Sequence, residues 1–221
     1  MKKSVAPKRN LNRILIWALV ALVLVGTAFA AIVVYESQQE DHMVVKKPAI
    51  YLYPKEDAFV KVQLDINGKL IHAIPEYGDG WNVFATKEGI IDGKYDYLFY
   101  EAQLNKLELS KSGWIVKYED LEDWFDEYLS KMGLNEKEKS QFKEYWLKEL
   151  PKSNYYEIKL LDDHFLKENM DLIISPKPDT VIRLNFYFKP LEEKIVLQEP
   201  SIVTPERVGF TVVEWGGILG K

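Results

Sequence analysis

Cysteine is absent from the 221-residue chain. Its absence excludes disulfide bonds, thiolate metal sites, a cysteine nucleophile and a lipid-modified cysteine. The fold must therefore be held by packing alone, and a folded part of about 175 residues is large enough to bury a sufficient core. The length fits one globular domain with an appendage, because domains commonly run to roughly 100 to 200 residues.

Positive charge is also scarce in the larger part of the chain. After residue 45 there are 31 acidic and 24 basic residues, a net charge of 7 negative. A nucleic-acid partner is not expected, because binding it would require the opposite sign. The sequence has no phosphate loop and no GxSxG elbow, and His72 and His164 fit no zinc pattern. We therefore expect no cofactor and no metal.

A long uncharged apolar run is present near the N-terminus. Residues 14–35 carry no charge, and as a helix they would span roughly 33 Å, against a hydrocarbon core of about 30 Å. Basic residues precede the run and acidic residues follow it, and the positive flank of a membrane helix stays in the cytoplasm. We predict a cytoplasmic tail at 1–13, a single-pass helix in the lipid bilayer at 14–35, a tether at 36–47 and an extracytoplasmic domain at 48–221.

A cleaved signal peptide is the alternative to this membrane anchor. Ala28-Phe29-Ala30 has the small-x-small form of a cleavage site. The apolar run continues past that point to Tyr35 and is longer than a typical signal core, which favours an uncleaved anchor in the cell membrane. Secretion after cleavage near Ala30 stays open.

Strand signals recur about every ten residues beyond the tether. Residues 59–66 alternate apolar and polar side chains, and Asn67-Gly68 suits a two-residue type I′ turn into 69–74, which predicts a β-hairpin. Further strands are predicted at residues 49–53, 81–86, 95–102, 113–118, 155–161, 170–174, 180–188, 194–197 and 209–215.

The period changes to that of helices between residues 119 and 150. An apolar stripe at i, i+3, i+4 and i+7 spacing begins at Leu121 and ends before Gly133. Asn135 and Glu138 form a capping box for a second helix, which Pro151 stops. The sequence thus predicts an antiparallel, β-rich α+β domain that a helical hairpin interrupts.

Several motifs occur together in one order: "KPAIYLYP", "PEYGDGWNVFA", "YDYLFYEA", "GLNEKEKSQFKEYW", "PKPDTVIRL" and "RVGFTVVEWGG". In these motifs the chain resembles a family of bacterial secreted or membrane-anchored proteins over about residues 47–217. The resemblance implies a bacterial, extracytoplasmic protein with a single exterior domain. It implies no activity, so chemistry must be argued from the residues.

Two carboxylates stand on apolar strand faces. Alternation places Glu214 on one face with Phe210 and Val212, and places Glu101 with Tyr97 and Phe99. Paired carboxyls beside aromatic rings suit glycoside hydrolysis, with one carboxyl as general acid and the other ionised. That chemistry requires the two groups to lie about 5 to 10 Å apart across an open cleft.

A structural role for these carboxylates is the interpretation we favour. Only Arg183 and Arg207 are arginines among the 24 basic residues after position 45. Arginine in a lysine background indicates a site that uses the planar guanidinium, such as a bidentate bond to a carboxylate. We expect Glu101 or Glu214 to pair with one of the two arginines. Ligand binding and catalysis are the alternatives.

Candidate binding residues lie in two places. The turn at residues 75–81 presents Tyr77, Asp79 and Trp81, and the strand cluster adds the two arginines with Trp215. We expect a binding or interaction module of the bacterial cell envelope, whose partner is an envelope protein or a glycan. An extracytoplasmic hydrolase of cell-wall or other glycan material, using Glu101 and Glu214, is the alternative.

Overall fold

The computed structural model describes residues 16–17 and 43–221. The predicted membrane helix lies outside the described residues apart from Ile16 and Trp17, which are helical, and the predicted tail and cleavage site lie wholly outside them. Within the described ranges, no helix combines the length and apolar character that crossing a bilayer requires. Residues 43–221 form a compact unit of their own.

This unit is an α+β structure built on two β-sheets. In the larger sheet neighbouring strands are antiparallel except β9 and β10, which are parallel. In spatial order the large sheet consists of β3 (Gly68–Ile74), β5 (Leu98–Leu104), β1 (Met43–Tyr53), β10 (Thr211–Leu219), β9 (Thr180–Leu191), β7 (Tyr155–Leu160) and β6 (Trp114–Lys117). The small sheet consists of β4 (Trp81–Ala85), β2 (Ala58–Ile66) and β8 (Met170–Ser175).

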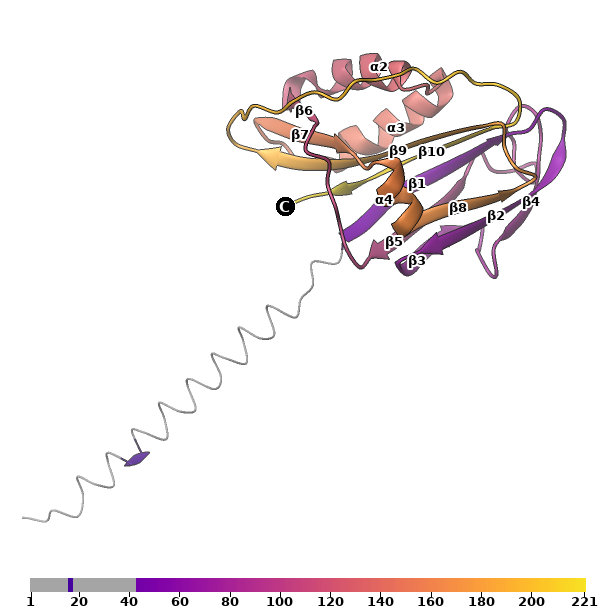
Figure 1. Cartoon of the computed structure of the whole chain (residues 1–221), viewed down its shortest axis with the longest axis horizontal. Coiled ribbons are helices and arrows are strands. Elements are labelled where there is room, and N and C mark those ends of the chain that lie inside the picture. The colour runs from indigo at the N-terminus through magenta and orange to yellow at the C-terminus, as the bar shows by residue number, and fades with distance from the viewer. Residues whose placement is uncertain (1–15, 18–42) are drawn as a thin grey trace, which may run out of the picture. The chain divides into compact units, whose positions relative to one another are not determined.

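Both faces of the large sheet are covered (Figure 1). The helices α2 (Leu121–Lys131) and α3 (Glu136–Glu149) pack on one side, which we call the helical face. The small sheet and α4 (Asp163–Asn169) pack on the other, the sheet face. Strand alternation separates two cores: Val213 and Trp215 of β10 belong to the helical face, and Val212 belongs to the sheet face.

The predicted helical hairpin is present, with a short 3₁₀ turn, η1 (Tyr118–Asp120), before α2. Gly133 ends α2 in a left-handed conformation with φ of 97°. The Asn135 side chain accepts a hydrogen bond from the Glu138 amide at 2.9 Å, and the Glu138 carboxylate accepts one from the Asn135 amide at 2.9 Å. The capping box is therefore confirmed.

The hairpin predicted around Asn67 and Gly68 is wrong. β2 pairs with β4 and β8, whereas β3 pairs with β5 in the other sheet. The Asn67 amide donates to the Asn169 carbonyl, and the Asn67 carbonyl accepts from the Asn105 amide, each at 3.0 Å. A Cβ on Gly68 would stand 1.9 Å from the Gln103 carbonyl oxygen. The dipeptide is thus a corner between two sheets, where the backbone of β5 comes too close for any other residue.

Three further segments differ from expectation. Residues 43–47, which the sequence placed in the tether, are the first part of β1. Residues 194–197 are not a strand but belong to the segment 192–210, called the strap below, which crosses α2 (Figure 1). The strap is long because consecutive parallel strands need a crossover connection. Residues 163–169, for which the sequence predicted neither a helix nor a strand, form α4, whose first turn the Asp162 side chain caps.

Replacing Gly68 tests the corner between the sheets. We expect Gly68→Ala to lower the free energy of unfolding by about 1 to 3 kcal/mol, because the new methyl group would collide with the β5 backbone. Urea melts followed by tryptophan fluorescence measure the change. Gly93→Asn is the matched control, since Gly93 has open space around its Cα and asparagine accepts its φ of 64°. Equal loss in both variants would contradict the close approach.

Candidate functional site

Glu214 lies at the centre of the sheet face with no exposed surface. Its Oε2 accepts hydrogen bonds from Arg183 Nε at 2.7 Å and from Asn185 Nδ2 at 2.9 Å, both on the adjacent strand β9. Its Oε1 accepts from the hydroxyl of Tyr100 at 2.7 Å, which reaches it from β5 across β1. The predicted carboxylate–arginine pair is therefore confirmed for Glu214 and Arg183.

Arg183 extends this network to the second sheet. Its Nη2 donates at 2.6 Å to the carbonyl of Met170, where α4 passes into β8. Burial by itself lowers the pKa of Arg183, but the charge and hydrogen bond of Glu214, together with the nearby Tyr100 and Asp171, outweigh it and the pKa is raised. Burial, followed by the Glu214 charge, raises the pKa of Tyr100 well above its usual value. Arg183 therefore stays cationic and Tyr100 stays protonated at neutral pH, so neither side chain can act as a general base.

Arg207 pairs with a carboxylate that the sequence did not single out for this role. Its Nη1 and Nη2 donate to the two oxygens of Glu138 at 2.8 and 2.9 Å, a bidentate geometry. Nη1 also donates to the Gly133 carbonyl at 3.0 Å. Glu138 is fully buried, and the guanidinium lies 5.0 Å above the Tyr53 ring. The pair fastens the strap to the start of α3.

Glu101 belongs to neither network, which corrects the expectation of a carboxyl pair. It follows Tyr100 along β5 and so lies on the helical face, where its charge reaches Tyr145 of α3. Glu214 is on the sheet face, and its oxygens are occupied by three donors. The two carboxyls share no cleft, so they cannot act together as acid and base on one glycosidic bond.

Some of the predicted binding residues are buried and others are exposed to solvent. Trp81 and Trp215 are buried and do not offer a ligand surface. The indole N–H of Trp81 donates to the Pro75 carbonyl at 2.8 Å, and the Tyr77 hydroxyl accepts from the Leu64 amide at 2.7 Å. These aromatic residues hold the turn against β2. Asp79 remains exposed at the tip of that turn.

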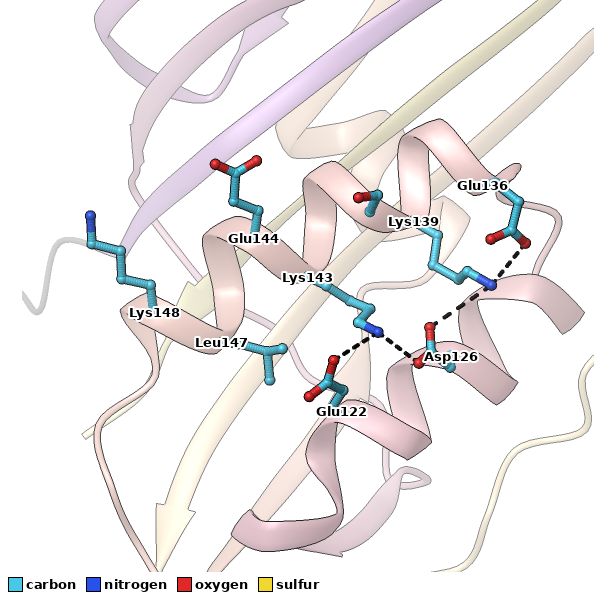
Figure 2. Close-up of a pocket in the computed structure, with 9 residues that line it drawn as sticks. Glu122, Asp126, Glu136, Lys139, Lys143, Glu144, Leu147 and Lys148 are labelled. Carbon is cyan, nitrogen blue, oxygen red and sulfur yellow. Dashed lines mark hydrogen bonds and ion pairs between the residues drawn. The ribbon is translucent and has the colours of Figure 1, made fainter.

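A groove of about 640 Å³ lies between α2 and α3 (Figure 2). Lys143 pairs with Glu122 at 3.1 Å and with Asp126 at 2.6 Å. Lys139 pairs with Glu136 at 2.9 Å and lies 3.9 Å from Asp126. These cations and anions satisfy one another, so this part of the groove is a helix-stabilising surface network.

A second hollow, about 290 Å³ in volume, lies on the helical face beside a bulge in β1. The pairing of β1 shifts register around Lys47 and Pro48, because proline has no N–H for the ladder. Lys47 takes a φ of 57°, and its Nζ donates to the Tyr97 hydroxyl at 2.8 Å. The same ammonium lies 4.7 Å from the centre of the Phe99 ring. We call this hollow the Lys47 pocket; it is lined by Lys47, Ile74, Lys94, Tyr95, Asp96, Tyr97, Phe99 and Gln141.

Polar groups in the Lys47 pocket are held in fixed positions. Asp96 accepts from Lys137 at 2.6 Å and from Gln141 Nε2 at 3.1 Å, and the Lys137 hydrogen bond is the main reason that the pKa of Asp96 is lowered. Gln141 in turn accepts from the Tyr51 hydroxyl at 2.7 Å. Sequence reasoning missed this pocket; the Lys47-Pro48 step immediately before the predicted strand at 49–53 was the available signal.

A search of curated proteins finds a relative that matches part of the chain. A protein of Butyrivibrio fibrisolvens described as "Uncharacterized protein in bglA 3'region" is 52% identical over 61 residues. The match covers 25% of this chain and 64% of the relative's length. No family model and no solved structure matches the chain.

Glu214→Gln tests the buried network. We expect it to lower the free energy of unfolding by about 3 to 5 kcal/mol, because it leaves the Arg183 charge buried without its partner. Urea melts give the midpoint and slope. Glu101→Gln is the control: Glu101 is only partly buried and has no arginine partner among the described residues, so its midpoint should change little. An unchanged midpoint for Glu214→Gln would contradict the structural role.

Proposed function

We propose that residues 43–221 are a ligand-binding module of the bacterial cell envelope, held at the outer side of the membrane by the apolar segment 14–35. The apolar run and its basic N-terminal flank support the location. The net negative charge of the exterior part argues for a partner other than nucleic acid.

The Lys47 pocket is the observation that carries the binding role. It combines aromatic rings with an ammonium, a carboxylate and an amide whose orientations are fixed by neighbouring side chains. Small-ligand sites have this composition: apolar walls with few, well-placed polar groups. Its volume of about 290 Å³ lies at the small end of ligand pockets, which run from about 300 to 1,000 Å³.

A sugar unit of an envelope glycan is the ligand class that we propose for this pocket. The apolar face of a sugar ring can lie against Phe99 or Tyr95, and its hydroxyl groups can donate to Asp96 and accept from Lys94. The pocket lacks the pair of carboxyl groups that glycoside hydrolysis requires, since Asp96 is its single carboxylate. The module therefore binds this ligand without cleaving it.

Removal of an aromatic wall tests the sugar site. We expect Phe99→Ala to weaken binding of an envelope saccharide about tenfold, because the ring supplies the stacking surface. Isothermal titration calorimetry with the full chain, in a detergent without a sugar headgroup, measures the affinity across a panel of envelope saccharides. Phe84→Ala is the matched control, because Phe84 is an exposed phenylalanine on the small sheet. Equal affinities in both variants, or no saccharide binding, would refute this site.

Protease treatment of intact cells tests the location separately. We expect added protease to degrade residues 43–221 while a cytoplasmic marker protein survives, because the basic flank keeps residues 1–13 inside. Immunoblotting against the C-terminal part gives the readout, and lysed cells provide the control for protease susceptibility. Protection in intact cells together with digestion in lysates would place the domain in the cytosol.

A further inference from the structure

The edge strand β6 has backbone groups without a partner on its outer side. It pairs with β7 alone, at one end of the large sheet. The Gly113 amide donates outward to the Gln198 carbonyl of the strap at 2.9 Å, whereas the Tyr118 amide donates inward to Asn154 at 3.1 Å. Antiparallel pairing alternates, so Ile115 and Lys117 turn their N–H and C=O groups outward. In the described part of the chain, nothing pairs with them there.

A groove of about 390 Å³ runs beside this free edge. Its floor is aromatic: the rings of Trp124 and Tyr128 stack with centroids 4.7 Å apart. Trp114 of β6 meets both rings edge-on, at 5.3 and 5.6 Å. The strap borders the groove through Lys194 and Glu199. An apolar floor therefore lies next to an unpaired strand.

Three of the four acidic side chains that line this groove lack an ion-pair partner among the described residues. Asp120, Asp123 and Glu199 line it and form no ion pair with any described residue. One of its two lysines, Lys117, pairs with Glu119 outside the groove at 3.3 Å. In the α2–α3 groove, by contrast, both central lysines are paired with carboxylates of the groove itself. Among the described residues, the β6 groove thus has three unpaired carboxylates against one unpaired lysine, Lys194, and carries an excess of negative charge.

We propose that β6 is a docking edge for an extended, lysine- or arginine-bearing segment of a partner protein, which adds to the large sheet as a further strand. The outward groups of Ile115 and Lys117 supply the backbone hydrogen bonds. Alternate side chains of the segment enter the groove, where their alkyl stems cover the rings and their charged ends meet the three free carboxylates. The edge is short and offers few backbone hydrogen bonds, so the charges of the groove select the partner. The backbone hydrogen bonds set the direction in which the partner segment runs.

A synthetic peptide tests the docking edge. The probe is a six-residue peptide of alternating lysine and threonine with blocked ends, added to the full chain in detergent. We expect hydrogen exchange at the Ile115 and Lys117 amides to slow, whereas the Val116 amide, already turned toward β7, stays unchanged. The double variant Asp123→Asn and Glu199→Gln should bind about tenfold more weakly, since two of the three free charges are lost.

Three controls separate this site from general attraction between charges. The variant Asp65→Asn with Glu108→Gln removes two exposed carboxylates elsewhere and should bind the probe as the natural chain does. A peptide N-methylated at alternate residues should fail to protect Ile115 and Lys117, and a glutamate-for-lysine peptide should not bind. Equal binding of either peptide, unchanged exchange at the two amides, or amides already protected in a dimer of the chain would overturn the proposal.

Discussion

The buried ion pair between Glu214 and Arg183 is the constraint on which the domain is built. A fully buried carboxylate is tolerated only if its charge is compensated and its lone pairs are filled, and here three side chains meet both needs. The three donors come from β5 and β9, and the arginine also reaches the backbone at the start of β8. One carboxylate therefore fixes the spacing of the large sheet and its position relative to the small sheet.

The glycines that follow Glu214 complete the same arrangement on the backbone side. A Cβ on Gly216 would stand 3.0 Å from the Pro48 backbone, and one on Gly217 would stand 2.8 Å from the Trp146 ring. These glycines thus allow β10 to pack closely against the proline bulge of β1 and against the Trp146 ring of α3. The bulge in turn directs Lys47 toward the aromatic residues of its pocket. The geometry of the pocket follows from the packing at the centre of the sheet.

The distribution of satisfied and free charges distinguishes structural sites from recognition sites. The buried carboxylates, Glu138 and Glu214, are each held by an arginine, and the two central lysines of the α2–α3 groove pair with carboxylates of that groove. Two other places have groups that can still bind a ligand or partner. The Lys47 pocket has fixed polar groups around aromatic rings, and the edge strand β6 has unpaired carboxylates beside it. A molecule with this pattern is suited to binding ligands and partners. Its buried carboxylates are not available for proton transfer, because each is held by an arginine.

Local signals in the sequence were sufficient for the elements that depend on neighbouring residues alone. The apolar stripe from Leu121, the capping box of Asn135 and Glu138, and the stop at Gly133 all act within one or two helical turns. The rarity of arginine correctly indicated carboxylate pairing. It could not assign Arg207 to Glu138, because 69 residues separate the two and only the path of the strap brings them together.

Tertiary structure decided what the alternation of strands leaves open. The sequence placed Glu101 and Glu214 on apolar strand faces. Alternation along a strand, however, does not determine which face of the sheet each set of side chains joins. Asn67-Gly68 resembles a hairpin turn, yet the chain passes there from one sheet to the other because β3 finds its partner in β5. The sequence by itself determined the α+β class, the helical hairpin and the need for buried arginine pairs, since those follow from local periodicity and charge. Strand order, the Lys47 pocket and the free edge of β6 arose only when distant strands paired, because hydrogen bonds between strands carry no local signal of their partner.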